Sequence, residues 1–209
     1  TFGHDFVDEE EVQFKTREEH FDIAMYRELA KNVRVVGIGE CGLDYYRLPD
    51  NRDHEEIKLL QRAAFHEQIK LAIELDKALC VHCRPSEGTL DAYLEMLNVI
   101  SDVKKDNPSL RFEIHCYTGD AETALKFVEL GGFVGLNGII TFDKTGRSES
   151  VVKALTLESI ILETDAPYLT PKSHRGQRNE PSYLPEVAQQ IADWKDVTVE
   201  AVAAQTTAN

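Results

Sequence analysis

The chain has 209 residues, with 23 Lys or Arg and 37 Asp or Glu, which gives a formal net charge of −14 at pH 7. This charge excludes a protein that holds nucleic acid by overall positive charge, although bound cations can still attract phosphates locally. No run of about 18 apolar residues predicts a transmembrane helix, and the acidic start at residues 1–11 does not resemble a signal peptide. We expect one domain over residues 1–209, with a cytoplasmic location and reduced cysteines.

Short apolar runs rich in Val and Ile alternate along the chain with stretches in which apolar residues recur at helical spacing. The predicted elements, in chain order, are the helix Arg17–Lys31, the strand Val33–Gly39, the helix His54–Leu75, the strand Ala78–His82, the helix Thr89–Ile100, the strand Leu110–His115, the helix Ala121–Leu130, the strands Gly132–Leu136 and Ser159–Glu163, and the helix Ser182–Trp194. Asp120 is expected to cap the helix that follows it. Alternating strands and helices favour an α/β protein with a parallel sheet.

Four of the predicted strands end in, or are followed within two residues by, a side chain that can bind a metal. These side chains are Glu40, His82, His115 and Asp165. Parallel sheets place their chemistry at the carboxyl ends of strands, so we expect these side chains on one rim. A lone histidine after a strand is more often structural, but four such residues together favour a functional site. Imidazole and carboxylate ligands suit Zn²⁺, Mn²⁺ and similar ions, and a carboxylate can bridge two of them.

Several segments at or near these residues resemble the TatD family of metal-dependent deoxyribonucleases. They are GIGECGLDYYR at Gly37–Arg47, VHCR at Val81–Arg84, IHCYTGD at Ile114–Asp120, GLNGIITF at Gly135–Phe142, ETDAPYLTP at Glu163–Pro171 and RGQRNEP at Arg175–Pro181. The match runs in order from about residue 33 to the end. The resemblance implies a TIM-type (β/α)8 barrel and a divalent-metal phosphodiesterase that trims DNA from a 3′ end.

The resemblance also implies roles for individual residues. Glu40 matches the family's bridging carboxylate, and His82 and His115 match two histidine ligands of one metal. Asp165 matches the aspartate that binds the other metal and orients the attacking water. Arg84 and the loop around Arg175 are expected near the scissile phosphate. The implied cofactors are one or two divalent ions, with Mg²⁺, Mn²⁺ and Zn²⁺ as candidates.

One departure from the family pattern concerns the His-x-His that ends its first strand, since none of the seven histidines of this chain forms that motif. We therefore expect a barrel that is incomplete at the N-terminus, with one well-formed metal site and one weaker site. In this interpretation His4 is either a substrate-binding histidine on the phosphate or water side, or an exposed terminal residue.

Other residues near the predicted ligands have alternative interpretations. Cys80 and Cys83 flank His82, and we interpret the four cysteines as small buried residues, with a cysteine-bound zinc as the alternative. Asp44 and Arg47 either orient ligands or cap the loop after Glu40. Glu163 is expected to support the ligands rather than to bind the metal.

The expected function is hydrolysis of phosphodiester bonds in single-stranded DNA or at 3′ ends, by a monomer with no membrane partner. Asp165 orients or deprotonates a metal-activated water, while Arg84 and Arg175 neutralise the phosphate. One alternative is a metal-dependent amidohydrolase that acts on a small cyclic amide or lactone, although the basic loop around Arg175 favours phosphate. A catalytically incomplete fragment or binding module is the other alternative.

Overall fold

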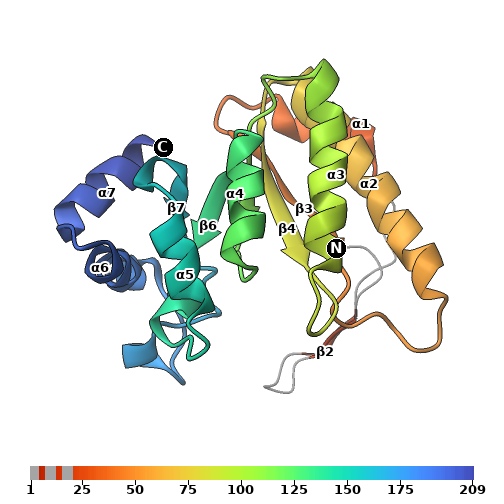
Figure 1. The fold of residues 1–209 in the computed structure, drawn as a ribbon. Helices are drawn as coiled ribbons and strands as arrows, with labels where there is room; N and C mark the ends of the chain where they lie inside the picture. Colours follow the sequence, from red (N-terminus) through yellow and green to blue (C-terminus); the bar gives the residue numbers. More distant parts are fainter. Residues whose placement is uncertain (1–4, 8–12, 16–20) are drawn as a thin grey trace. The chain divides into compact units, whose positions relative to one another are not determined.

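A computed structural model describes residues 5–7, 13–15 and 21–209 of the chain (Figure 1). The chain comprises two compact units, the first spanning residues 1–112 and the second residues 113–209. Among the residues with a described position, none of the helices has both the length and the apolar character that a bilayer span requires.

The described residues of the first unit form two pairs of strands and three helices. They are the antiparallel strands β1 (Asp5–Val7) and β2 (Gln13–Lys15), the helix α1 (Ile23–Ala30), the parallel strands β3 (Gly37–Asp44) and β4 (Ala78–Arg84), and the helices α2 (His54–Glu74) and α3 (Asp91–Asp106). Both α2 and α3 contact β3 and β4 (Figure 1). The largest fully buried side chains between them include Phe65 and Tyr93. This apolar layer fixes β3 and β4, which carry Glu40 and His82. The prediction that Glu40 stands at a strand end was wrong, because β3 continues past it to Asp44.

The second unit is built on three parallel strands that pair in chain order. They are β5 (Phe112–His115), which begins at the last residue of the first unit, β6 (Phe133–Leu136) and β7 (Ile160–Leu162). The helices are α4 (Ala121–Glu129), α5 (Arg147–Ala154), α6 (Leu184–Lys195) and α7 (Val199–Ala208), with short 3-10 turns η1 (Gly138–Thr141), η2 (Leu157–Ser159), η3 (Lys172–His174) and η4 (Pro181–Tyr183). Helix α4 contacts β6, and α6 and α7 contact β7. Val134 pairs with both Ile114 and Ile160 at the centre of these strands.

The predicted α/β class is confirmed, because parallel strands alternate with helices in both units. Each predicted strand has a counterpart among β3 to β7, and the predicted helices correspond to α1, α2, α3, α4 and α6. The prediction of a single domain over the whole chain stays a prediction. Two further helices, α5 and α7, were not predicted because α5 is short and polar and α7 is rich in alanine, so neither has a clear apolar stripe.

The predicted strand Val33–Gly39 was wrong in its first half, because β3 begins only at Gly37. The Asn32 side chain accepts a hydrogen bond from the Arg34 amide at 3.0 Å, and the Asn32 carbonyl accepts one from the Val35 amide at 3.0 Å. Asparagine side chains that bond to the nearby backbone compete with sheet pairing and favour turns. Val33 and Val36 are consequently 92% and 82% exposed, although the sequence suggested burial.

Several helix ends also differ from their predicted positions. Helix α1 begins at Ile23, with Asp22 accepting hydrogen bonds from the amides of Ala24 and Met25, and the predicted start at residues 17–20 lies outside the described residues. Helix α3 continues to Asp106, six residues beyond its predicted end, since its last turn consists of polar residues that the apolar pattern does not mark. The predicted start of α6 at Ser182 belongs instead to the turn η4.

The predicted cap at Asp120 is present, since its carboxylate accepts a hydrogen bond from the Thr123 amide at 2.8 Å. This hydrogen bond holds the pKa of Asp120 below its ordinary value of 3.8. A carboxyl with a lowered pKa in the folded state stabilises the fold above its unfolded pKa, and the contribution is lost as the pH falls through the folded pKa.

We predict that Asp120→Ala lowers the free energy of unfolding by about 1 kcal/mol at pH 7, because one amide at the start of α4 loses its partner. The deficit relative to the unmodified chain should shrink only as the pH falls below about 4 and through the lowered pKa of the folded Asp120 carboxyl, where the carboxylate becomes protonated. Urea unfolding followed by circular dichroism at a series of pH values measures both effects. Asp120→Asn is the matched control, because asparagine caps helices equally well without titrating. An Asp120→Ala variant as stable as the unmodified chain at pH 7 would contradict the capping role.

Candidate metal centre

Glu40 and His82 form a carboxylate–imidazole pair in the first unit. Glu40 lies on β3 at an irregularity, where three steps from Ile38 to Cys41 oppose two steps from Leu79 to Val81 on β4. Such a bulge inserts one extra residue and redirects the side chains next to it. Oε2 of Glu40 lies 3.7 Å from Nδ1 of His82, and the Glu40 side chain is 48% exposed. A carboxylate accessible to solvent therefore faces one ring nitrogen of His82.

The other ring nitrogen of His82 is held by Asp44, which is 2% exposed. Nε2 of His82 lies 2.9 Å from Oδ2 of Asp44, while Oδ1 of Asp44 accepts a hydrogen bond from the Tyr46 amide at 3.1 Å. Since a carboxylate only accepts hydrogen bonds, Nε2 of His82 is the protonated nitrogen of the neutral ring. Nδ1, the nitrogen that faces Glu40, then carries the lone pair that can bind a metal.

Two residues hold Asp44 and His82 at this distance. Gln61 on α2 is buried, and its side chain accepts from the Asp44 amide at 2.8 Å and donates to the Asp44 carbonyl at 2.9 Å. Gly42 has a φ of +144°, and a Cβ atom at this position would overlap the carbonyl oxygen of His82. Only glycine therefore allows β3 and β4 to approach this closely beside the pair.

His115 and Asp165 form a second carboxylate–imidazole pair, in the other unit. His115 is the last residue of β5, and Asp165 follows β7 by three residues. Nε2 of His115 lies 3.4 Å from Oδ1 of Asp165. Nδ1 of His115 lies 2.5 Å from Oε2 of Glu163, whose other oxygen accepts a hydrogen bond from the Cys116 amide. Glu163 thus orients His115 as Asp44 orients His82, although here Nε2 is the nitrogen turned toward the second carboxylate.

The local backbone is shaped around Glu163. A Cβ atom on Gly135 would lie 2.7 to 2.9 Å from the carboxylate atoms of Glu163, so β6 carries glycine where this side chain needs space. Cys116 and Asp165 adopt positive φ angles of 50° and 58°, which non-glycine residues rarely do. Such conformations are held in place by the surrounding structure, here by the contacts of Glu163 with His115 and the Cys116 amide. Burial raises the pKa of the Glu163 carboxyl, and its hydrogen bond with His115 opposes this rise.

The donor atoms of each pair fit a divalent cation. Two ligand atoms bound at about 2.1 Å in a tetrahedral arrangement lie about 3.4 Å apart. The observed separations are 3.7 Å between Glu40 and His82 and 3.4 Å between His115 and Asp165. Carboxylate oxygens and neutral imidazole nitrogens are also the ligands that Zn²⁺ and Mn²⁺ accept.

Burial disfavours the thiolate form of three of the cysteines near the pairs, Cys41, Cys83 and Cys116. Cys41 and Cys83 are buried, and all four cysteines are free thiols. Burial raises the pKa of Cys41 to about 12 and that of Cys116 to about 12, so both stay protonated at neutral pH. A thiol must lose its proton to act as a strong ligand or nucleophile. The interpretation as small buried residues therefore holds for Cys41 and Cys83, whereas Cys80 and Cys116 are only partly buried.

Two of the three predicted substrate-binding residues, Arg84 and Arg175, each lie beside an aromatic ring. Arg84 is the exposed last residue of β4, with its guanidinium carbon 3.9 Å from the centroid of the Tyr46 ring. Arg175 is exposed after η3 in the second unit, 4.4 Å from the centroid of the Phe142 ring. His4 lies outside the described residues. Their contacts with substrate stay predictions, as do the metal-binding roles of the four predicted ligands.

Gln61 and Gly135 are supporting residues that the sequence analysis missed. Gln61 occupies the apolar face of α2, four residues from both Ile57 and Phe65, all of them buried. A polar side chain at such a position needs a hydrogen-bonding partner, and this is a signal that the sequence contains. Gly135 gives no comparable signal, because the need for space arises only when Glu163 is placed beside it.

Comparisons with known proteins identify the family. The family profile described as TatD related DNase matches residues 7–209. The chain is 35% identical over 188 residues to the uncharacterized metal-dependent hydrolase YabD of Bacillus subtilis, covering 90% of this chain and 68% of the relative. It is 34% identical over 186 residues to the 3′-5′ ssDNA/RNA exonuclease TatD of Klebsiella pneumoniae, covering 87% of this chain and 65% of that protein. The chain therefore spans about two thirds of the length of these relatives.

Solved structures agree with this assignment. The crystal structure of YjjV, a TatD homologue from Escherichia coli, matches with a TM-score of 0.77 and 26% identity, covering 91% of this chain and 70% of that one. A TatD family hydrolase from Entamoeba histolytica matches in fold, with a TM-score of 0.66 and 19% identity, covering 88% of this chain and 64% of that one. These neighbours are TIM-barrel proteins, which confirms the predicted fold type. The chain belongs to the TatD-related DNase family, whose members include metal-dependent hydrolases and nucleases.

Proposed function

We propose that this chain is a metal-dependent phosphodiesterase that removes nucleotides from the 3′ end of single-stranded DNA. One observation carries the proposal. In each unit a buried or largely buried carboxylate holds one nitrogen of a histidine, and the other nitrogen faces a second carboxylate. This is the arrangement that fixes histidine ligands in metal sites. The relatives named as metal-dependent hydrolases and as a 3′-5′ exonuclease support the type of reaction.

The proposed ligands are Glu40 and His82 in the first unit and His115 and Asp165 in the second, which would hold one or two divalent ions. When bound, such an ion polarises the phosphate and lowers the pKa of a coordinated water toward neutrality. Asp165 is proposed to orient this water and to accept its proton, since its side chain is 33% exposed and its Oδ1 lies 3.4 Å from the imidazole of His115. Asp44 and Glu163 act by positioning the two histidines.

The proposed phosphate contacts are the guanidinium groups of Arg84 and Arg175, together with His4. Guanidinium groups bind phosphate with two parallel hydrogen bonds, and both arginines are exposed. A single strand or a free 3′ end is the proposed substrate because the net charge of −14 opposes a long duplex. Mg²⁺, Mn²⁺ and Zn²⁺ remain the candidate ions, and the monomeric state and cytoplasmic location stay predictions.

The first prediction from this proposal concerns DNA degradation by the metal-stripped chain after addition of Mg²⁺, Mn²⁺ or Zn²⁺. Single-stranded DNA labelled at the 3′ end should lose its label first, while the 5′-labelled strand shortens progressively. His115→Ala should lower the rate at least about a hundredfold, because the proposed site loses a ligand. His66→Ala is the matched control, since His66 is exposed on α2 and contacts neither pair.

Other outcomes of the same assay would contradict the proposal. Hydrolysis of small lactones or cyclic amides without any loss of nucleotides would identify an amidohydrolase. The absence of turnover with every metal would identify a catalytically incomplete chain, in agreement with the lack of a His-x-His motif.

A second prediction concerns Asp44→Asn. The asparagine oxygen can still accept from the Tyr46 amide, which turns its NH₂ group toward His82. Nε2 of His82 then becomes an acceptor, and the proton moves to Nδ1, the proposed metal-binding nitrogen. We expect about 10- to 100-fold weaker Mn²⁺ binding in calorimetric titration. Nitrogen-15 NMR of the metal-free chain should show the reversed tautomer.

Asp53→Asn is the control for this experiment, because Asp53 caps α2 at an exposed position and asparagine is an equivalent cap. The metal affinity of this variant should equal that of the unmodified chain. If Asp44→Asn binds Mn²⁺ as tightly as the unmodified chain and keeps the proton on Nε2, Asp44 has no positioning role.

A further inference from the structure

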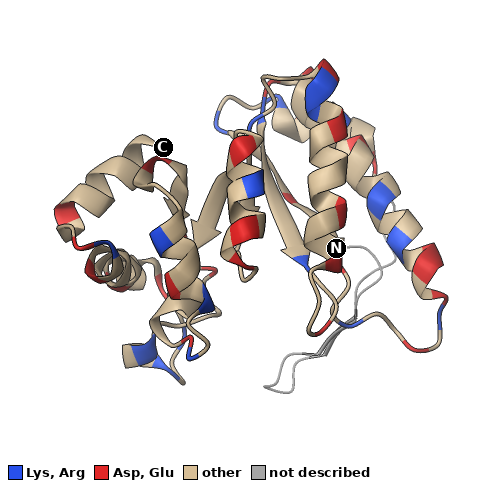
Figure 2. Ribbon diagram, in the orientation of Figure 1, with Lys and Arg blue, Asp and Glu red and all other residues tan. Residues whose placement is uncertain are grey.

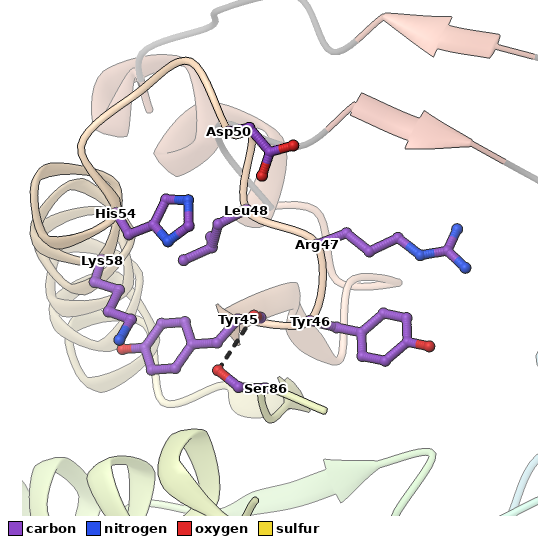
Figure 3. A pocket seen from close by; sticks show the side chains of 8 residues that line it. All are labelled: Tyr45, Tyr46, Arg47, Leu48, Asp50, His54, Lys58 and Ser86. Carbon is purple, nitrogen blue, oxygen red and sulfur yellow. Dashed lines mark hydrogen bonds between the residues drawn. The ribbon is translucent and has the colours of Figure 1, made fainter. Parts of the chain in front are cut away.

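The loop that follows β3 carries an aromatic ring, Tyr46, close to two arginines. The guanidinium carbon of Arg84 lies 3.9 Å from the centroid of the Tyr46 ring, and that of Arg47 lies 5.2 Å from it. Figure 3 shows the side chains of Tyr46 and Arg47 projecting to the same side of the loop. Tyr45 and Leu48 point to the opposite side, where His54 and Lys58 lie. The ring of Tyr46 is half-buried, whereas Arg47 and Arg84 are exposed.

A backbone hydrogen bond connects the loop at Tyr46 to the carboxylate that holds His82. The Tyr46 amide donates to Oδ1 of Asp44, and Oδ2 of the same carboxylate holds His82. The Tyr45 amide donates to the carbonyl of Arg84 at 2.8 Å, which joins the start of the loop to the end of β4. The backbone of the loop that carries Tyr46 is therefore tied both to the carboxylate that holds His82 and to the end of β4.

The local charge favours an anionic ligand. Basic residues are scattered among a majority of acidic ones along the ribbon in Figure 2, and Arg84 forms the basic end of β4. Arg47 and Tyr46 also line a cavity of about 480 Å³, whose other lining residues include Lys58 and His54 on the opposite side of the loop and one carboxylate, Asp50. In a chain with a net charge of −14, this loop supplies the local cations that a polyanion requires.

An aromatic ring with an arginine side chain close to it also suits the binding of an unpaired base. Unstacked bases bind on aromatic rings and on the flat faces of arginine side chains, because every base has a π-face. An exposed contact between a cation and a ring contributes little to folding stability, so the fold itself does not demand this arrangement. Bases at the interior of a duplex have both faces covered by their neighbours, and only an unpaired base can bind in this way.

We propose that Tyr46 and Arg84 form a stacking platform for one nucleobase of an unpaired strand, with Arg47 on a neighbouring phosphate. The inference rests on the proposed nuclease function and deepens it, because it names the feature by which this site selects single strands. The platform belongs to the first unit alone, since Tyr46, Arg47 and Arg84 all lie within residues 1–112.

Binding of a base-free strand separates stacking from phosphate contacts. The full chain, with a chelator added to prevent turnover, is titrated into fluorescently labelled oligothymidylate of about ten nucleotides and into an abasic strand of the same length. Fluorescence anisotropy measures both dissociation constants. We expect Tyr46→Leu to weaken binding of oligothymidylate about tenfold and to leave binding of the abasic strand unchanged. Tyr46→Phe keeps the ring and should bind both strands as the unmodified chain does.

Tyr26→Leu is the matched control, because Tyr26 is an exposed tyrosine of the same unit at a distant position. It lies on α1, which is joined to the last residue of α2 by the ion pair between Arg27 and Glu74. The cavity beside Tyr46 is lined by His54, the first residue of the same helix, and 21 residues of helix span about 30 Å. This variant should bind both strands normally.

Other results would overturn the platform. Equal weakening of both strands by Tyr46→Leu would show that the variant disturbs phosphate contacts or the fold, and an unchanged affinity for oligothymidylate would show that the ring is not used. A failure of the proposed hydrolase gives a different pattern. If the hydrolase proposal fails, the chain cleaves no DNA, but Tyr46→Leu still weakens binding of oligothymidylate. If only the platform proposal fails, the chain cleaves DNA and Tyr46→Leu leaves binding of oligothymidylate unchanged.

Discussion

The hydrogen bond between a carboxylate and an imidazole is the interaction on which the proposed site depends. A neutral histidine can present either ring nitrogen to a metal, and the partner of the other nitrogen decides which one. Asp44 selects Nδ1 of His82, whereas Glu163 selects Nε2 of His115. The same kind of hydrogen bond therefore turns Nδ1 of His82, but Nε2 of His115, toward the second carboxylate of its pair. The geometry toward the metal is set before any metal binds.

The need to hold these two carboxylates in place explains the presence of residues that are not themselves proposed metal ligands. A buried carboxylate is costly unless its oxygens accept hydrogen bonds. Asp44 meets this condition through His82 and the Tyr46 amide, and Gln61 fixes its backbone. Glycine at position 135 leaves the space that the Glu163 carboxylate occupies. A substitution at Gln61 or Gly135 would therefore alter the proposed metal site without changing a proposed ligand.

The sequence predicted the elements with strong periodicity and failed where a local interaction competes with the pattern. Helix α2 begins at its predicted residue because its apolar stripe is long and Asp53 caps it, whereas Val33 belongs to a turn that Asn32 stabilises. The proposed ligands stood out because metal-binding side chains follow apolar runs. The pairing of Asp44 with His82 could not be predicted, since it depends on a strand register that includes an irregularity beside Glu40.

The acidity of the chain bears on how a nucleic acid substrate is recognised. A net charge of −14 repels a polyanion at long range, and salt screens this repulsion over about 10 Å. Attraction must therefore come from short-range contacts, which an exposed guanidinium beside an aromatic ring provides. Stacking depends little on ionic strength, whereas phosphate contacts weaken steeply with salt. A platform built from Tyr46 and Arg84 combines both kinds of contact at one place, so that a strand is held only where an unpaired base and its phosphate arrive together.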